Sequence, residues 1–157
     1  MDLFDLQSSL VHAFGARASK AILLYVYDDD SLSENLGTAK ELKGYIFKNR
    51  YGQKLFVYKD YAPELMSYNR ACEFCSEITF KGVSCSPGNA NVLAWDLFDE
   101  ERNKLLSKAG MQPIDNRKIW STTPYAYNHW IVNPESKGLD YGRDFEKFYV
   151  RPICFIN

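Results

Sequence analysis

The amino-acid sequence predicts an α+β fold with a mainly antiparallel sheet, two main helices and a short N-terminal helix. Three observations support this class. Phe, Trp and Tyr make up 15% of the chain, and aromatic residues favour half-buried strands. Apolar residues recur at helical spacing in two stretches, 65–78 and 99–110. Segments of strand type lie before and after those stretches, which is an element order typical of α+β domains.

Length and charge indicate one ordinary globular domain. The chain has 157 residues, 46% of them apolar and 25% charged, with a formal net charge of −1. These values suit a single core, and the near-neutral charge gives no reason to expect a nucleic-acid partner. The longest apolar run, 21–27, is far shorter than the roughly 20 residues that cross a bilayer. We therefore expect no membrane span.

Residues 1–20 predict an amphipathic helix ahead of a single domain at 21–157. The helix would end near Gly15 and either dock on its own domain or join copies in a homo-oligomer. Asp2 and Asp5 stand where a secretory signal carries Lys or Arg, so no export signal is expected in this chain. The chain as written is expected in the cytoplasm or in a phage particle. A cell-surface location is expected instead if Met1 stands where a longer N-terminal segment has been removed. Its apolar stripe is Leu3, Leu6, Leu10 and Phe14.

Strand-type segments come next. AILLYVY at 21–27 predicts a buried strand. The stretch DDDSLSENLG at 28–37 predicts a polar loop, because its three Asp lack the alternating oxygen ligands and the turn Gly of a calcium loop. Two aromatic-rich runs, 45–47 and 55–58, flank a turn at Gly52 and predict a β-hairpin.

Two helices are predicted after the hairpin. From Ala62 the spacing of apolar residues becomes helical, and Pro63 is compatible with the first turn of a helix. The stretch 81–92, KGVSCSPGNANV, predicts a loop by composition. A second helix is predicted from an N-cap at Asp99, with Glu100 and Glu101 at the positive end of its dipole, to a stop at Gly110. The first helix, of about four turns, would carry on one face Leu65, Tyr68, Cys72, Cys75 and Ile78.

Three short strands complete the prediction. They are IWSTT at 119–123, HWIVN at 129–133 and KFYVRPICFI at 147–156. The turns between them are expected at Pro124, Pro134, Gly138 and Gly142.

The C-terminal third resembles a known bacterial family. WSTTPYAYNHWIVN followed by FYVRPI is similar to the W-S-S-T … W … Y-V-R-P signature of the C-terminal domain of Lcl-type collagen-like adhesins. Upstream, GYIF at 44–47 and the Cys75 that ends NRACEFC also resemble the family. AWDLFDEERNKL matches it only at Trp95 and Leu97. The signature positions are Trp120, Ser121, Thr122, Trp130, Tyr149, Val150, Arg151 and Pro152.

That resemblance implies a fold of the C-type-lectin-like, formylglycine-generating-enzyme type. In such proteins long loops on a compact scaffold bind ligands, glycans among them, on bacterial surfaces or phage tails. Three residues depart from the family in its middle segment, Asp96, Phe98 and Arg102, where it has Arg, Pro and Glu. Equivalence of that middle loop is therefore open.

The four cysteines leave three interpretations. Cys72, Cys75 and Cys85 are spaced C-x-x-C-x9-C, but structural zinc sites usually use two close doublets and only one is present. The resemblance implies instead a disulfide between Cys75 and Cys154, which would suit an exported protein. In the cytosol the same residues would be buried thiols. We predict no metal and no cofactor.

An enzyme is the least supported function. His12 and His129 are the only histidines, and neither accompanies a recognisable nucleophile motif. Formylglycine-generating enzymes, which the chain resembles, hold copper with a late cysteine pair, and this chain offers only Cys154 there. We therefore predict a protein without catalytic residues.

The stretch 118–130 divides into core and binding surface. Trp120 and Trp130 are predicted to fill the core, Ser121 to Thr123 to hydrogen-bond the backbone of a turn, and Arg151 to bond a buried carbonyl or carboxylate that ties the last strand down. The loops 83–95, 123–129 and 134–144 are predicted to bind the ligand. The candidate ligand-binding residues are Tyr125, Tyr127, Asn128, His129, Tyr141 and Arg143.

These features predict a non-catalytic recognition or adhesion domain, of bacterial or phage origin, that binds a glycan or protein. The alternative is an intracellular or phage-encoded structural protein that oligomerises through its N-terminal helix.

Overall fold

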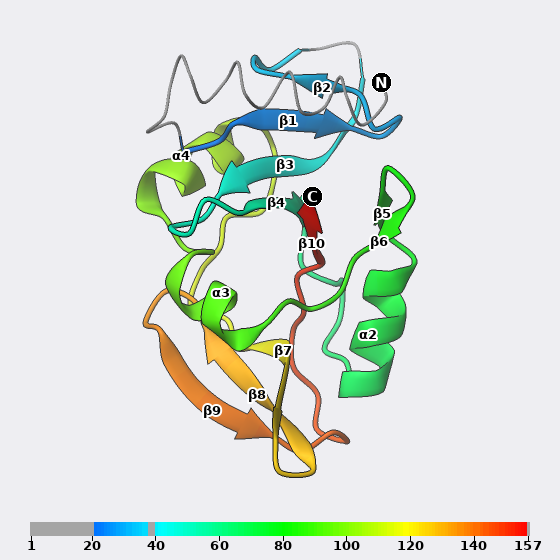
Figure 1. Ribbon diagram of the computed structural model, residues 1–157, viewed down its shortest axis with the longest axis vertical. Helices are drawn as coiled ribbons and strands as arrows, with labels where there is room; N and C mark the ends of the chain where they lie inside the picture. The colour runs from blue at the N-terminus through cyan, green and yellow to red at the C-terminus, as the bar shows by residue number, and fades with distance from the viewer. Residues whose placement is uncertain (1–20, 38–39, 157) are drawn as a thin grey trace.

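A computed structural model describes residues 21–37 and 40–156. The predicted N-terminal helix, with the oligomer contact through Leu3, Leu6, Leu10 and Phe14, lies outside these residues, as does His12. The α+β class with mostly antiparallel sheets is confirmed (Figure 1). None of the helices in the described ranges has the length and apolarity needed to cross a membrane.

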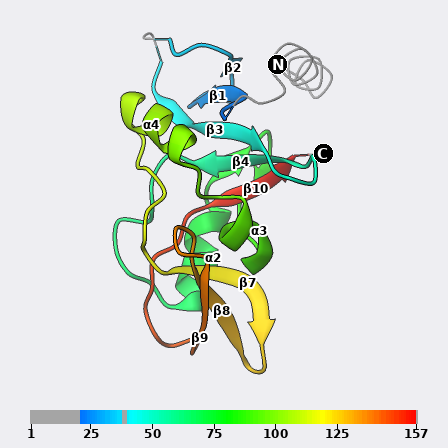
Figure 2. The ribbon, with the colours of Figure 1, turned by 90° about the vertical axis from the view of Figure 1, so that its left-hand side faces the viewer.

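The upper half of the molecule in Figure 1 is a five-stranded antiparallel sheet in the order β10-β4-β3-β1-β2. Its strands are β1 (Leu24–Tyr27), β2 (Leu32–Ser33), β3 (Leu42–Lys48), β4 (Lys54–Tyr58) and β10 (Ile153–Ile156). Figure 2 shows these strands stacked one below another, with β10 at the middle of the molecule. The predicted hairpin is confirmed as β3 and β4, in which Tyr45 pairs with Val57.

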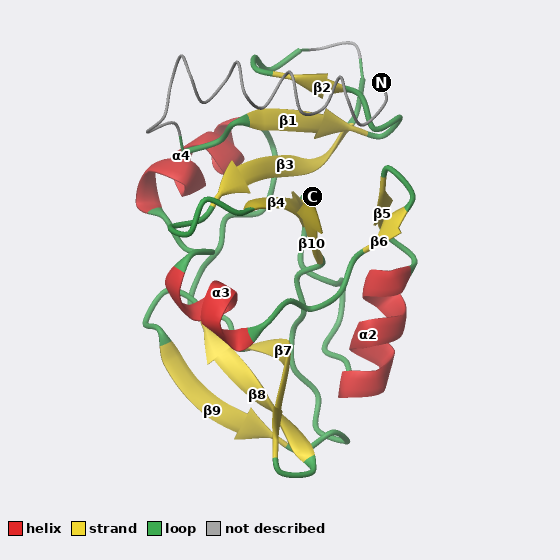
Figure 3. Ribbon diagram, viewed as in Figure 1, coloured by secondary structure: helices red, strands yellow, loops and turns green. Residues whose placement is uncertain are grey.

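The lower half is a three-stranded sheet in chain order. Its strands are β7 (Ile119–Tyr125), β8 (Asn128–Asn133) and β9 (Gly138–Gly142). A minor pair, β5 (Thr79–Phe80) and β6 (Val83–Ser84), lies after the first helix. The helices within residues 21–37 and 40–156 are α2 (Tyr68–Ser76), α3 (Ala90–Trp95) and α4 (Glu100–Lys108), drawn red in Figure 3.

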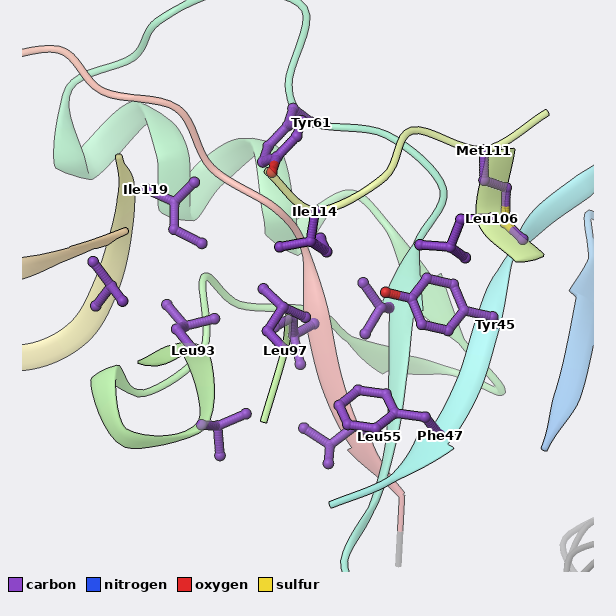
Figure 4. Close-up of a cluster of buried hydrophobic side chains, with 14 of the residues drawn as sticks. Tyr45, Phe47, Leu55, Tyr61, Leu93, Leu97, Leu106, Met111, Ile114 and Ile119 are labelled. Atoms are coloured by element: carbon purple, nitrogen blue, oxygen red, sulfur yellow. The ribbon is translucent and has the colours of Figure 1, made fainter. Parts of the chain in front are cut away.

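The five-stranded sheet is buried on both faces, which explains its almost continuous apolar runs. Alternate residues of one strand point to opposite faces, so Ile46 and Phe56 join one core and Tyr45 and Leu55 the other. The first core contains residues of α2 and Trp120. The second, shown in Figure 4, is closed by Leu93 and Leu97 from the α3 region and by Leu106 of α4.

Helix α4 begins and ends where the sequence predicts. The Asp99 carboxylate accepts a hydrogen bond from the Arg102 N–H at 2.8 Å, and Glu100 and Glu101 occupy the first turn. Gly110 follows the helix with a φ of 80°, a conformation that glycine adopts at no steric cost.

The other helix predictions need correction. Helix α2 starts at Tyr68, so the predicted first turn from Pro63 and the exposed Leu65 lie outside it. The segment before α2 bends at 63–64 and is not helical, because the Ala62 N–H donates to Val150 O at 3.0 Å and Met66 exchanges two bonds with Phe148. Long-range pairing with the C-terminal segment therefore overrides the local helical period.

The loop predicted at 81–92 contains β6 and the start of α3. Asn89 is the N-cap, and its side chain accepts from the Val92 N–H at 2.8 Å. The polar loop predicted at 28–37 likewise contains β2.

Two strand predictions also differ from the structure. Gly138 and Gly142, predicted as turns, bound strand β9, which pairs with β8 along its whole length. The predicted strand 147–156 is reduced to Ile153–Ile156, because Pro152 has no N–H for a sheet ladder. Tyr149 before it forms only an isolated bridge with Ile119.

Candidate functional site

An open groove lies between α3 and the β7–β9 sheet. Its volume is about 490 Å³. We call it the α3 groove. Its lining residues are Asn89, Ala90, Asn91, Ala94, Trp95, Thr123, Trp130 and Leu139.

Sheet register explains why the groove is aromatic. In β8 and β9, Trp130 pairs with Tyr141 and Val132 with Leu139, so these four side chains share one face. Deep in the molecule Val132 is buried in the second core, whereas Leu139 and Tyr141 are exposed. The same face therefore changes from core in β8 to open surface in β9.

Three rings form a continuous aromatic strip beside the groove. The Tyr125 ring lies 4.5 Å from Trp130 and 5.2 Å from Tyr141, measured between centroids. Tyr125 and Tyr141 keep 44% and 45% of their surface exposed. Exposed aromatic rings that support one another in this way are rigid contact surface with little conformational entropy to lose.

Trp95 forms the opposite wall of the groove, at the end of α3. Its side chain is 53% exposed. Arg50 lies 5.8 Å from the centroid of its ring, and Lys137 lies 5.5 Å from it while donating to Ala94 O at 3.2 Å. Asp96, which follows, is buried; it accepts from the Arg50 backbone N–H at 3.5 Å and forms an ion pair with the Arg50 guanidinium, also at 3.5 Å. Both cations therefore lie within cation–π distance of the Trp95 ring.

Polar groups of the groove join α3 to the sheet. The Ala90 N–H donates to Thr123 Oγ1 at 2.9 Å, and the Thr122 N–H donates to Gly88 O at 2.8 Å. The Asn91 amide oxygen accepts from Arg50 at 3.1 Å. Since the oxygens of Asn89 and Asn91 are engaged, their amide N–H groups are what these residues can offer a ligand.

The predicted role of Arg151 is confirmed, whereas Ser121 bonds the backbone of a neighbouring strand and not of a turn. Ser121, fully buried, donates to Trp130 O at 2.7 Å. Arg151 is fully buried and donates to three backbone carbonyls, those of Tyr58, Lys59 and Gln112. Its role is to tie the C-terminal segment to β4 and to the chain after α4.

The two signature tryptophans have different environments. Trp120 is fully buried, and its indole N–H donates to Met66 O at 2.7 Å, so its predicted core position is confirmed. Trp130 is only partly buried, because it packs on the second core at one edge and lines the groove at the other. The prediction that Trp130 fills the core is therefore correct only in part, because the ring also lines the groove.

The predicted ligand-binding residues separate into two faces. Tyr125 and Asn128 lie in strands rather than in a loop, and only Ala126 and Tyr127 form the turn between them. Tyr127 is 97% exposed at its tip. Arg143 is exposed in the turn after β9, where its N–H donates to Glu146 at 2.9 Å.

His129 lies on the face away from the groove. Its ring stacks on Tyr68 at a centroid distance of 3.5 Å, and its Nδ1 lies 3.0 Å from the Asp144 carboxylate. Burial, followed by a hydrogen bond with Cys72, raises the pKa of Tyr68. These contacts join β8 to α2 and to the turn after β9, which is a structural role.

The cysteines are free thiols, and Cys75 is not bonded to Cys154. Cys154 instead contacts Cys85. Within the described residues no group of three or more His, Cys, Asp or Glu side chains is placed to hold a metal ion.

The fold and site thus define an α+β domain with an aromatic groove beside its smaller sheet. Comparison with known proteins found no matching family model, no matching curated protein and no matching solved structure.

Trp95 and Leu139 lie in segments predicted to bind ligand but were not singled out from the sequence as binding residues, and Trp130 was predicted only as core. For Trp95 a signal existed in the residues of its helix. The buried residues Ala90, Val92, Leu93 and Ala94 gather on one side of α3 at helical spacing, and Trp95 falls on the opposite side.

Proposed function

We propose that the protein is a non-catalytic recognition domain that binds a glycan in the α3 groove. The observation that carries this proposal is the pairing of exposed aromatic rings with amide and hydroxyl groups in one groove of oligosaccharide size. Sugar rings present apolar C–H faces, which suit Trp95 and Trp130, and hydroxyls, which suit Asn89, Asn91 and Thr123. Ligand sites commonly have this composition and a volume of about 300–1,000 Å³.

The groove is also preorganised. Arg50 and Lys137 flank Trp95, Tyr125 packs on Trp130, and Thr123 is bonded to the first turn of α3. Because these side chains are already ordered, a ligand would lose little affinity in fixing them.

The resemblance to Lcl-type adhesin domains supports the same function. We propose a C-type-lectin-like scaffold, whose ligand surface comes from chain segments far apart in sequence. The three segments predicted to bind ligand, 83–95, 123–129 and 134–144, each contribute lining residues to the groove: Asn89, Thr123 and Leu139 are examples. They do so largely as helix and strand ends rather than as loops.

A glycan array of defined oligosaccharides, probed with the purified full chain, tests the proposal. Trp95→Ala and Tyr125→Ala each remove an exposed ring of the site, and each is expected to weaken binding about two- to tenfold, since one aromatic contact contributes about 0.5–1.5 kcal/mol. Phe155→Ala is the matched control, because Phe155 is an exposed aromatic residue of the other sheet. It should leave binding unchanged.

Two outcomes would contradict a glycan ligand. Array binding that Trp95→Ala and Tyr125→Ala leave intact would remove the groove as the site. No array binding, together with a protein partner that is lost in the same two variants, would assign the groove to protein recognition.

A further inference from the structure

Cys85 and Cys154 face each other across two paired chain segments. Ser86 and Ile153 form an antiparallel bridge in which each N–H donates to the other's carbonyl at 2.9 Å. In antiparallel pairing, the residues next to such a doubly bonded pair form a non-hydrogen-bonded pair with Cα atoms about 4.5 Å apart. Cys85 and Cys154 occupy these positions, and disulfides span Cα separations of about 4.4–6.8 Å.

The two thiols are in contact. Cys85 donates a hydrogen bond to Cys154, which lowers the pKa of Cys154 and raises that of Cys85. Each residue is 95% buried, because both have a relative exposure of 5% in the first core. Cys75 is a second neighbour of Cys85 but lies fully buried on α2. Burial raises the pKa of Cys75, which makes it the poorer nucleophile.

We propose that Cys85 and Cys154 are a site of reversible oxidation, at which a low-molecular-weight disulfide converts the two thiols into a cross-strand disulfide bond. The Cys154 thiolate attacks one sulfur of the reagent, which forms a mixed disulfide and releases one thiolate. Cys85 then loses its proton, attacks the Cys154 sulfur and releases the second thiolate. Two electrons pass from the protein to the reagent, which leaves as two thiols.

The disulfide bond would connect the large sheet to the segment that leads into α3. Cys154 lies in β10, at the edge of the large sheet. Cys85 leads through the buried Pro87 and Gly88 to Asn89, the N-cap of α3. Oxidation would therefore fix the start of α3 against the last strand. This site does not depend on the proposed glycan function, because no cysteine lines the α3 groove.

Incubation of the full chain with oxidised glutathione tests the proposal. The intact mass without reductant should fall by two hydrogens and return on reduction, and peptide mapping should recover residues 85 and 154 in one linked fragment. Cys72→Ser, which removes the most exposed of the four thiols, should keep the bond. Cys85→Ser and Cys154→Ser should each abolish it.

Three results would overturn the assignment. The chain could keep four free thiols in excess oxidised glutathione, or peptide mapping could show Cys75 linked to Cys154 or to Cys72. The third is that Cys85→Ser still forms the disulfide bond. The map uses the unaltered chain, so it decides the question even where a buried serine impairs folding.

Discussion

Replacement of Arg151 by Ala should be one of the most destabilising single changes in this protein. The Arg151 side chain is fully buried. Its Nε donates to Tyr58 O at 2.6 Å, and its Nη2 donates to Lys59 O at 2.9 Å and to Gln112 O at 2.8 Å. These three carbonyls belong to two chain segments, so one side chain holds three parts of the backbone together.

The magnitude follows from the groups left behind. A hydrogen bond to a charged group contributes about 1.5–3 kcal/mol, and a buried carbonyl that loses its donor costs about 1–3 kcal/mol. Some of this cost is recovered, because the variant no longer buries a charge and water can enter the space. We expect a net loss of about 4 kcal/mol, close to that for breaking a buried ion pair. In a chain of this length this corresponds to a fall in Tm of about 8–16 °C.

Urea unfolding, followed by tryptophan fluorescence and by circular dichroism, measures this loss. Arg70→Ala is the matched control, because Arg70 is 46% exposed and pairs only with Glu73 on the surface of α2. It should change stability by less than about 0.5 kcal/mol. Arg151→Lys keeps the charge but cannot reach three carbonyls, so it should recover only part of the loss. A loss below about 1 kcal/mol in Arg151→Ala would refute the reasoning.

Three further predictions concern packing, pH and oxidation. Gly142→Ala should cost about 1–3 kcal/mol, because its Cβ would lie 2.9 Å from Trp120 ring atoms; Gly138→Ala in the same strand is the control, and equal urea midpoints for both would contradict the packing argument. Burial raises the pKa of Tyr61 to about 12, so the stability that its neutral form contributes is complete below about pH 10 and is lost as the pH rises through about 12. Urea midpoints that stay constant from pH 9 to 12 would be inconsistent with this. The bond between Cys85 and Cys154 should raise the free energy of unfolding by about 4 kcal/mol, the chain-entropy value for a loop of this length, and identical midpoints for the oxidised chain with and without reductant would exclude that gain.

The sequence predicts best those elements whose signal is local. Strands β3 and β4 were predicted because each is an apolar run flanking Gly52, and α4 because Asp99 and Gly110 mark its two ends. The prediction fails where a distant segment decides the local structure. Residues 62–66 have a helical period, yet Ala62 and Met66 bond to the C-terminal segment and the stretch between them forms no helix.

Strand β9 is a second case in which a distant contact decides the local structure; here a predicted turn proves to be a strand. Gly138 and Gly142 favour a turn by composition, but Gly142 lies where the Trp120 ring leaves no room for a Cβ. Gly142 is therefore needed so that β9 can pack against the Trp120 ring. This contact cannot be predicted from the residues next to Gly142 in sequence.

The candidate site could be predicted in part. Tyr125 and Tyr141 were expected at the ligand surface, and both are exposed on one face of the small sheet. His129, next to Trp130 in sequence, lies on the opposite face, because neighbouring residues of a strand alternate. The groove itself required α3, which the sequence analysis placed in a loop.

The position of β10 also bears on the order of folding. Strands β3 and β4 are joined by a short turn, and such hairpins form in about 1–10 μs. The pairing of β10 with β4 brings together Ile153 and Val57, which are far apart in sequence. The chain between them must therefore lose loop-closure entropy before this contact can form. We expect the hairpin to form early and β10 to dock late. Until then the β4 edge is open, and a slow-folding chain would present it to other molecules as a template for aggregation.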